Sequence, residues 1–585
     1  MDYALGLPSF LEKEALRLVL FGGKGGTGKT TCAAASAVYL AQRRPDRKLL
    51  LVSTDPAPSL GDSLDQAVGD QVVPVEGVDN LSAWELDAGR LLAEFKRESD
   101  PILLKIVDRG TYFDREDIKD FLDLSVPGMD EFMATLALMK LVNARQYDLI
   151  LLDTAPTGHT IRLLELPGQL QQWIAVLHLM MEKHRFLSRA FTGRYQPDEC
   201  DRWLQTMATD ARSIQRLLQN TEATEFVAIT IPEELALAET VRLVSALKRL
   251  LIPIQNLLVN HVLDRERLCP SCQQRRADQA EPLEKIEREF ADLRFLKVPR
   301  LPREVRGLKG LSEFAQLLTG MPLPAAGSGA TPTASAALAE QDLPHRLRLP
   351  TSRFLLIGGK GGVGKTTVAA ATALKLASRF PQRRILVFSI DPAHSLSDSF
   401  GQKIGAEITA ISGYENLYAQ EIDAPKRLEE FKREYREAVD DLFNAFLGSG
   451  GRAGATKVRY DREVMEHLLD MTPPGIDEVI AVLEIMGRLE RNEFDTFVLD
   501  TAPTGHLIRF LETPDMVRIW LASTVKLLLK YRGMVRLESV AELVLNHARQ
   551  ARRLRALLLD ASRTDFLVVT IPEAMAMAET ERLLS

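Results

Sequence analysis

The chain has 585 residues, of which 46% are hydrophobic and 26% are charged, and its formal net charge is −7; this length predicts at least two domains. The acidic balance argues against a nucleic-acid binder, which usually carries a basic excess. Four cysteines in so long a chain fit a reducing compartment and argue against a disulfide scaffold.

The N-terminal stretch lacks the basic n-region and the cleavage site of a secretory signal peptide. No apolar run reaches the roughly 18–20 residues that a bilayer-spanning helix needs. We therefore expect a cytoplasmic protein that associates with membranes peripherally at most.

The first motif in the chain is a glycine-rich loop, GKGGTGKT, at residues 23–30. It lies between a predicted strand and a predicted helix, the context of a phosphate-binding loop with the pattern GxxxxGK[ST]. The glycines let backbone N–H groups point at a phosphate, and the helix N-terminus adds partial positive charge. Lys29 is expected to reach the β- and γ-phosphates of ATP, and the Thr30 hydroxyl to hold Mg²⁺. The predicted nucleotide-binding residues are Gly23, Gly25, Gly26, Thr27, Gly28, Lys29, Thr30 and Thr31.

The same stretch also matches the shorter dinucleotide pattern GxGxxG, and ordinary glycine turns are a further alternative. The Lys-Thr pair that ends the loop favours a triphosphate ligand, and the recurrence of the loop as GKGGVGKT at residues 359–366 argues against chance. The predicted binding residues of the second loop are Gly359, Gly361, Gly362, Val363, Gly364, Lys365, Thr366 and Thr367.

The chain reads as a tandem repeat. Lys365 lies 336 residues after Lys29, and the same offset relates STDPAPSLGDS to SIDPAHSLSDS, WELDA to QEIDA, and two copies of EFKRE. The offset becomes 347 for VPGMDE and PPGIDE and for two copies of DTAPTGH. We predict a first domain at 1–319, a flexible linker at 320–350 and a second domain at 351–585, which is expected to lack the C-terminal part of the first.

Each half alternates short β-branched runs with longer helical patterns, which is typical of βαβ units in a mostly parallel sheet with helices on both faces. The stretches between the strands are expected to be helical. In the first half the predicted strands lie at 16–23, 48–55, 147–154, 225–232, 254–261 and 293–300. The predicted fold class is α/β, with two tandem P-loop NTPase domains.

Aspartates follow apolar strands in both halves, at the sheet edge where α/β proteins bind ligands. Asp55 and Asp391 could orient or deprotonate an attacking water, and a helix N-cap is the alternative. Asp153 and Asp500 stand in the Walker B arrangement. The predicted Mg²⁺ ligands are Thr30, Asp153, Thr366 and Asp500. The APTGH segment after each Walker B aspartate is expected to respond to the γ-phosphate.

Each loop also carries an additional lysine, Lys24 or Lys360. This deviant Walker A loop resembles that of the dimeric ATPases related to MinD, ParA and the nitrogenase iron protein. The resemblance implies that each lysine reaches across an interface to the phosphates of the other half, much as an arginine finger does. We therefore predict an intrachain pseudodimer in which Lys24 completes the site built on Lys365, and Lys360 the site built on Lys29. A solvated loop lysine is the alternative.

The motifs GGKGGTGKT, DPAPSL, PGMDE and DTAPTGH, all doubled, resemble those of the arsenite-pump ATPase (ArsA) family. This family includes the tail-anchored-protein targeting ATPase of the guided-entry pathway. The resemblance covers nearly the whole chain apart from the linker and implies Mg²⁺-dependent hydrolysis of ATP. The residues with implied catalytic roles are Lys24, Asp55, Lys360 and Asp391.

The resemblance also implies that Asn260 contacts adenine, together with the loop at 298–307. The second half has no counterpart of Asn260, so the two sites are expected to be unequal. A second departure is Pro58, which stands where the second half has His394.

The cysteines bear on the cargo, because As(III) and Sb(III) bind about three converging thiolates. Cys32 is expected to pack in a buried helix, and Cys200 to be an incidental surface thiol. The second half has no cysteine, so the metalloid site that the family draws from both halves is not visible.

Cys269 and Cys272 form a CPSC motif, which supplies half of a tetrahedral zinc site. In the related targeting ATPase a similar pair meets its dimer mate around zinc. The resemblance therefore implies a candidate Zn²⁺ site that joins two chains. Redox chemistry, metalloid binding and no function are the alternatives.

Methionine-bearing apolar stripes at 166–187 and 513–531 fit either a groove for hydrophobic membrane-protein clients or ordinary core packing. Three functions stay open. The first is an ATPase that energises an integral membrane transporter of metalloid oxyanions, which the two-copy architecture favours. The second is an ATP-switched chaperone that serves a membrane insertase. The third is a binding-only nucleotide switch, which the paired Asp55 and Asp391 disfavour.

Overall fold

The structure is a computed structural model. It describes, as continuous stretches, residues 7–55, 60–110, 129–263, 270–301, 304–319, 352–360, 363–389, 395–422, 493–501 and 552–572. Further single residues and pairs are described between 429 and 491, at 549 and between 577 and 584. The linker predicted at 320–350 lies outside the described residues.

An eight-stranded sheet organises the first half, in the order β3-β4-β2-β5-β1-β6-β7-β8. All neighbouring strands are parallel except β3 and β4. The strands are β1 (Leu18–Gly23), β2 (Leu49–Ser53), β3 (Val73–Val75), β4 (Val78–Glu85), β5 (Leu149–Asp153), β6 (Thr224–Thr230), β7 (Ile254–Val262) and β8 (Arg294–Pro299). All six strands that the sequence predicts are present, so the mostly parallel sheet is confirmed.

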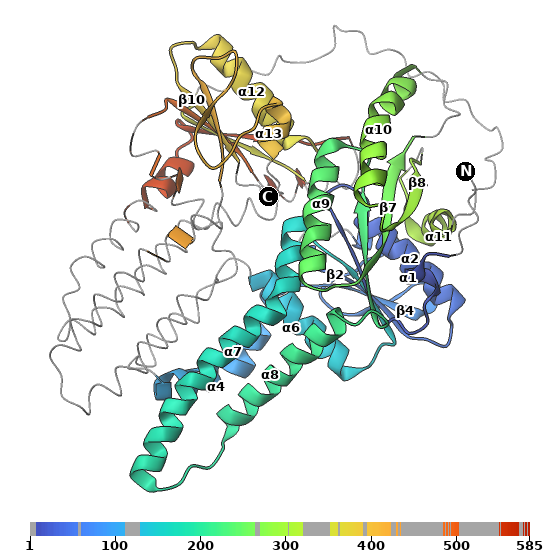
Figure 1. Cartoon of the computed structure of the whole chain (residues 1–585), viewed down its shortest axis with the longest axis vertical. Helices are drawn as coiled ribbons and strands as arrows, with labels where there is room; N and C mark the ends of the chain where they lie inside the picture. The colour runs from blue at the N-terminus through green and yellow to red at the C-terminus, as the bar shows by residue number, and fades with distance from the viewer. Residues whose placement is uncertain are drawn as a thin grey trace, which may run out of the picture.

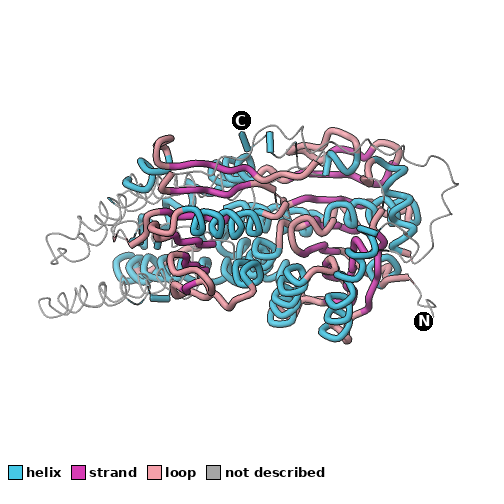
Figure 2. The backbone as a smooth tube through the Cα atoms, turned by 90° about the horizontal axis from the view of Figure 1, so that it is seen from above, coloured by secondary structure: helices cyan, strands magenta, loops and turns pink. Residues whose placement is uncertain are grey.

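The apolar runs of these strands are continuous because both faces of the sheet are covered. In β1, Leu18 and Leu20 join one core cluster, while Val19 and Phe21 join a second, and all four side chains are fully buried. Successive side chains of a strand point to opposite faces, so the two clusters lie on the two sides of the sheet. In Figure 2 the strands run as layers with helices alongside them.

The helices divide between the two clusters. Those packed on the cluster of Leu18 are α4 (Ala88–Gly110), α6 (Met129–Ala144), α7 (Thr157–Thr192), α8 (Glu199–Leu218), α9 (Glu234–Arg249) and α10 (Pro270–Glu289). Those packed on the cluster of Val19 are α1 (Ser9–Glu12), α2 (Lys29–Arg43), α3 (Leu60–Leu64) and α11 (Gly307–Leu318). The prediction of helices on both faces is thus confirmed for the first half.

Helices α4, α6, α7 and α8 pack on one another and extend beyond the sheet (Figure 1). Met180 and Met181 of α7 are buried in the core cluster that these helices share, and Trp173 and Leu177 pack against it. Core packing therefore accounts for the methionine-bearing stripe of the first half. The second stripe, at 513–531, lies outside the described residues.

The second half forms a six-stranded sheet in the order β11-β12-β10-β13-β9-β14. Its elements are β9 (Phe354–Gly358), α12 (Lys365–Arg379), β10 (Ile385–Ser389), α13 (Ser395–Phe400), β11 (Thr409–Ala410), β12 (Leu417–Glu421), β13 (Thr496–Asp500) and β14 (Thr564–Val568). This order repeats the first six strands of the first sheet, with β14 in the place of β6. The tandem α/β repeat predicted from the motif offsets is confirmed.

The expectation that every stretch between the six strands is helical was wrong at residues 73–85. Strand β4 pairs with β2 in parallel and buries Val78, Leu81 and Ala83, whereas β3 folds back on it antiparallel. Gly77, with φ of +79°, permits the reversal between them. Val78 lies three residues before Leu81, so the alternation of buried and partly exposed residues is too short to identify a strand from the sequence.

No helix within the described stretches combines the length and the apolar character that crossing a bilayer requires.

Candidate functional site

Each glycine-rich loop follows a central strand and leads directly into a helix. Gly28 and Gly364 precede α2 and α12 with φ of +89° and +90°, left-handed values that favour glycine. The helices begin at Lys29 and Lys365, so their unsatisfied N–H groups face the loops. This arrangement suits the binding of an anion such as a phosphate.

Close backbone contact fixes the first glycine of each loop. A Cβ atom on Gly23 would lie 2.0 Å from the carbonyl oxygen of Ile229, and one on Gly359 would lie 2.1 Å from that of Val569. Both glycines have φ within the range that other residues rarely adopt, +157° and +147°. The two loops therefore share one tight geometry, although Gly361 and Gly362 lie outside the described residues.

The loop lysines are buried and point back over their own loops. Lys29 Nζ donates to the carbonyl oxygen of Lys24 at 3.4 Å, and Lys365 Nζ to that of Lys360 at 3.1 Å. Both side chains are largely buried. Each loop thus holds an ammonium group beside the helix N-terminus, where it would neutralise phosphate charge.

A threonine–aspartate pair lies beside each lysine. Thr30 Oγ1 donates to Asp153 Oδ2 at 2.7 Å, and Thr366 Oγ1 donates to Asp500 Oδ2 at 2.8 Å. The hydroxyls of Ser53 and Ser389 reach the same oxygens, at 3.2 Å in both halves. The structure therefore brings together the residues predicted to hold Mg²⁺, in the same way in both halves.

The chemistry of this oxygen cluster fits Mg²⁺. Asp153 is fully buried, and its Oδ1 atom has no hydrogen-bond partner. Burial raises the pKa of Asp153 to about 7; the charge of Lys29 opposes that rise and the charge of Asp55 adds to it. A buried carboxylate with an unused oxygen next to a threonine hydroxyl offers the hard oxygen ligands that Mg²⁺ prefers.

Asp55 lies just beyond the end of β2, where its backbone N–H donates to Ser53 Oγ at 3.3 Å. Its charge acts on Asp153, so Asp55, Asp153 and Lys29 belong to one site. Its predicted partner in the second half, Asp391, lies outside the described residues.

The additional lysine of the first loop contacts its own half. Lys24 Nζ lies 3.7 Å from Glu239 Oε1 in α9, and the two side chains are 15% and 8% exposed. The carbonyl oxygen of Lys24 also accepts a hydrogen bond from Thr27 Oγ1 at 2.9 Å. In this structure Lys24 is thus held in a largely buried ion pair rather than being a solvated loop lysine.

Asn260 lies behind the first loop at the end of β7. Its Nδ2 atom donates to the carbonyl oxygen of Thr27 at 2.9 Å, and the side chain is buried. In the adjacent loop, predicted to take part in base contacts, Arg306 Nε donates to the carbonyl oxygen of Asp62 at 3.2 Å. The adenine contact itself stays a prediction, and Asn260 additionally supports the loop backbone.

The sequence did not predict the roles of Glu85 and Glu421, which lie in the repeated segments WELDA and QEIDA. Glu85 Oε1 accepts hydrogen bonds from the N–H groups of Leu60 and Gly61, at 2.7 and 3.2 Å. Glu421 Oε1 accepts one from the N–H of Ser397 at 3.0 Å. Each glutamate ends a strand and caps the short helix after Asp55 or Asp391. The doubled WELDA and QEIDA segments were the signal that could have found them.

A buried pair links two further motifs of the first half. His159 Nδ1 of DTAPTGH lies 2.5 Å from Glu131 Oε1 of PGMDE, and both residues are buried. Burial alone would raise the pKa of Glu131, but the hydrogen bond and charge of His159 lower it to about 2. The segment after the Walker B aspartate is therefore fastened to α6.

Replacing Glu131 by Gln is expected to lower the free energy of unfolding by about 1.5–3 kcal/mol, because it removes the charge from a buried hydrogen bond. In thermal unfolding followed by intrinsic fluorescence, this corresponds to about 3–8 °C. Since the folded-state pKa is depressed, the stabilisation is present above about pH 4.5 and is lost as the pH falls toward about 2. The exposed Glu98→Gln, which only breaks a surface pair with Lys140, is the control; an equal loss in both variants would refute the prediction.

The two cysteines whose side chains the structure describes, Cys32 and Cys200, are buried. Cys32 lies in α2, where burial and then the charge of Asp153 raise the pKa of its thiol. Cys200 lies in α8 and is fully buried, so the expectation of a surface thiol was wrong. Its neighbours Asp198 and Asp201 form a capping box at the start of α8, which turns Cys200 inward.

The CPSC motif is only partly described. Cys269 lies outside the described residues, and Cys272 lies in α10 with a side chain outside the description. Within the described part of the chain, no group of three or more His, Cys, Asp or Glu side chains could hold a metal ion.

We expect a thiol reagent to modify at most two of the four cysteines in the native chain, because Cys32 and Cys200 are inaccessible and poorly ionised. All four should react after unfolding. In a Cys269→Ser/Cys272→Ser variant, native reactivity should vanish. Three or more fast-reacting thiols in the native protein would contradict this burial.

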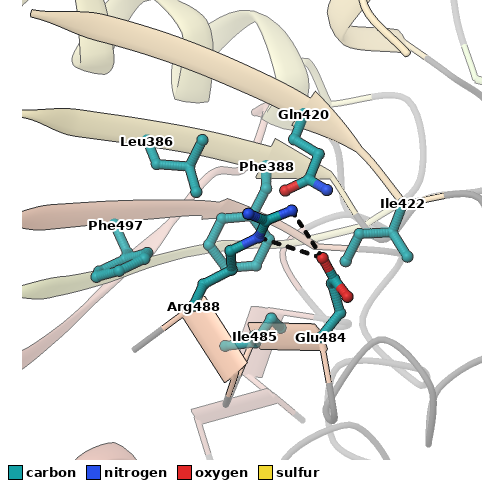
Figure 3. A pocket seen from close by; sticks show the side chains of 8 residues that line it. All are labelled: Leu386, Phe388, Gln420, Ile422, Glu484, Ile485, Arg488 and Phe497. Atoms are coloured by element: carbon teal, nitrogen blue, oxygen red, sulfur yellow. Dashed lines mark hydrogen bonds and ion pairs between the residues drawn. The ribbon is translucent and has the colours of Figure 1, made fainter. Parts of the chain in front are cut away.

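A small pocket lies in the second half (Figure 3). Its lining residues are Leu386, Phe388, Gln420, Ile422, Glu484, Ile485, Arg488 and Phe497. Within it, Arg488 Nε donates to Glu484 Oε1 at 3.2 Å. None of the predicted site residues lines this pocket, so it is separate from the nucleotide site.

Comparison with known proteins agrees with the doubled geometry. A family model described as anion-transporting ATPase matches residues 16–320 and 352–585. The chain is 30% identical over 523 residues to a "putative arsenical pump-driving ATPase" of Halobacterium salinarum, covering 86% of this chain and 75% of that protein. It is 31% identical over 622 residues to "ATPase ARSA1" of Chlamydomonas reinhardtii, covering 97% and 77%. It is 34% identical over 290 residues to "ATPase ASNA1 homolog 2" of Paramecium tetraurelia, covering 48% and 86%.

Proposed function

The chain belongs to the anion-transporting ATPase (ArsA) family, and on that premise we propose that it hydrolyses ATP at two composite sites to drive arsenite or antimonite export. The observation that carries the proposal is the duplicated cluster of loop lysine, threonine and buried aspartate. Its threonine–aspartate distances are 2.7 Å in the first half and 2.8 Å in the second.

In the proposed mechanism the two halves face each other as a pseudodimer. Lys29 and Lys365 neutralise the phosphates bound in their own loops, while Lys24 and Lys360 reach the nucleotide of the opposite half. Covalent linkage makes the meeting of the halves intramolecular and raises its effective concentration.

The acidic residues of the two sites have two roles, activation of the attacking water and binding of Mg²⁺. Asp55 and Asp391 orient the attacking water and accept its proton. Thr30 with Asp153, and Thr366 with Asp500, would hold Mg²⁺, which would supply positive charge beside the bound phosphates. Glu85 and Glu421 keep the helices that follow Asp55 and Asp391 tied to the sheet.

Arsenite or antimonite is the proposed cargo because both halves align with a relative whose name states an arsenical pump-driving role. The partner would then be an integral membrane transporter, and the chain itself would act in the cytoplasm. Since Cys32 and Cys200 are buried, thiolate contacts to a metalloid would fall to Cys269 and Cys272.

The alternative is a chaperone that delivers hydrophobic membrane-protein segments to an insertase. Single-copy relatives named ASNA1 homologs match about half of the chain, which keeps this alternative open. The burial of Met180 and Met181 weighs against a client groove at that stripe in the first half. A Zn²⁺ ion shared by the CPSC motifs of two chains would fit this alternative better than the first.

The test measures ATP turnover of the full chain with arsenite, with antimonite, with arsenate as a non-thiophilic control, and with a solubilised hydrophobic transmembrane peptide. We expect the trivalent metalloids to stimulate turnover and arsenate not to. Stimulation by the peptide alone would favour the chaperone function. No ATP turnover under any condition would refute the enzyme assignment.

A further inference from the structure

The ion pair between Lys24 and Glu239 has a mechanistic consequence. The proposed mechanism sends the Lys24 ammonium group to the nucleotide in the opposite half, but here it lies 3.7 Å from a Glu239 carboxylate that is 8% exposed. A carboxylate so far removed from water needs a nearby cation. Glu239 and the opposite nucleotide therefore compete for one ammonium group.

Rigid elements hold Glu239 in this place. Strand β6 pairs with β1 so that Ile229 lies beside Gly23, directly before Lys24. The hydroxyl of Thr240, next to Glu239, donates to Thr230 Oγ1 at 2.9 Å and so fixes α9 to the end of β6. The carboxylate is thus positioned by the sheet and a helix rather than by a loop.

The second half repeats this docking. Thr580 Oγ1 donates to Thr570 Oγ1 at 3.0 Å, as Thr240 does to Thr230. The residue before Thr580 is Glu579, within the same Ala-Glu-Thr sequence. Glu579 itself lies outside the described residues.

We propose that Glu239 is a positioning residue that retains Lys24 in its own half until a nucleotide at the second site draws the lysine away. The inference rests on the proposed cross-interface role of Lys24. When Lys24 leaves, its ion pair with Glu239 is lost, and this cost lowers the population of the hydrolysing arrangement. Glu239 thereby lowers turnover at the second site, because it holds Lys24 away from the nucleotide bound there.

The experiment uses the full chain with Asp55→Asn, so that the second site carries the hydrolysis. Glu239→Gln keeps the side-chain shape and removes the charge. We expect it to raise kcat about three- to tenfold without raising KM, because the resting arrangement loses its ion pair. Lys24→Ala should lower kcat, and adding Glu239→Gln to it should change nothing further, since the effect of Glu239 acts through Lys24.

Glu225→Gln is the matched control, because Glu225 is also a buried glutamate but lies at the start of β6, away from the loop. It should leave kcat unchanged. Equal stimulation by both glutamine variants, or a kcat for Glu239→Gln that is unchanged or lower while Lys24→Ala is impaired, would overturn the role of Glu239 alone. An unimpaired Lys24→Ala would overturn the cross-interface mechanism as well.

Discussion

A chain that carries both Lys24→Ala and Lys360→Ala is expected to hydrolyse ATP about 10²–10³-fold more slowly than the unmodified protein, the range found when one charge-stabilising group is lost. Its affinity for ATP should change by less than about threefold, because Lys29 and Lys365 still bind the phosphates within each half. Lys24→Ala alone should impair only the site built on Lys365, and Lys360→Ala alone only the site built on Lys29. In each single variant the unaffected site should continue to hydrolyse ATP. Steady-state turnover and equilibrium nucleotide binding measure the two effects separately.

Lys248→Ala provides the control for this pair of substitutions. Lys248 lies on α9 like Glu239, but it is 55% exposed and pairs with Asp292 at the surface. Its removal should leave both turnover and affinity as they were. Unchanged turnover in the double Lys24/Lys360 variant would show that the lysines do not act across an interface.

Gly23→Ala should strongly weaken nucleotide binding in the first half, and Gly359→Ala should do so in the second. The added Cβ atom would meet a backbone carbonyl oxygen at 2.0 or 2.1 Å, so the loop must leave its geometry. Backbone strain of about 2–3 kcal/mol corresponds to a loss of affinity of about 30- to 150-fold at that site. Titration calorimetry should then find one nucleotide bound per chain instead of two.

Gly69→Ala is the matched glycine control, because a Cβ atom there meets nothing within 4 Å. Its nucleotide binding should equal that of the unmodified chain. If Gly23→Ala and Gly359→Ala retained two nucleotides of normal affinity, the loops would not be the phosphate-binding elements.

Most strands were predictable from the sequence because strands buried on both faces are continuous apolar runs. Strand β1 is apolar throughout, since Leu18 and Val19 face two different cores. Strand β4 alternates buried and partly exposed residues only around Leu81 and Ala83, because Val78 lies three residues before Leu81 and breaks the period of two. Its pairing with β2 identifies the segment as a strand.

The candidate site was predictable where function depends on residues adjacent in sequence. The loop glycines and Lys29 form one continuous motif. Glu85, Glu131 and Glu239 act on partners 24 or more residues away, so their roles emerge only when the chain is folded. For Cys200 the prediction from the local sequence was wrong. Its acidic neighbours suggested an exposed segment, but they cap the start of α8, and Cys200 is buried.

The short antiparallel strands β3 and β11 limit mispairing between the two repeated halves of the chain. Each forms the outer edge of its sheet, where a longer strand could pair with a neighbouring molecule or with the matching strand of the other half. Strand β3 has three residues and contains Pro74, which lacks an N–H donor, and β11 has only two residues. At these two edges the strands are too short to offer much pairing surface, so two copies of one fold have little opportunity to exchange strands there.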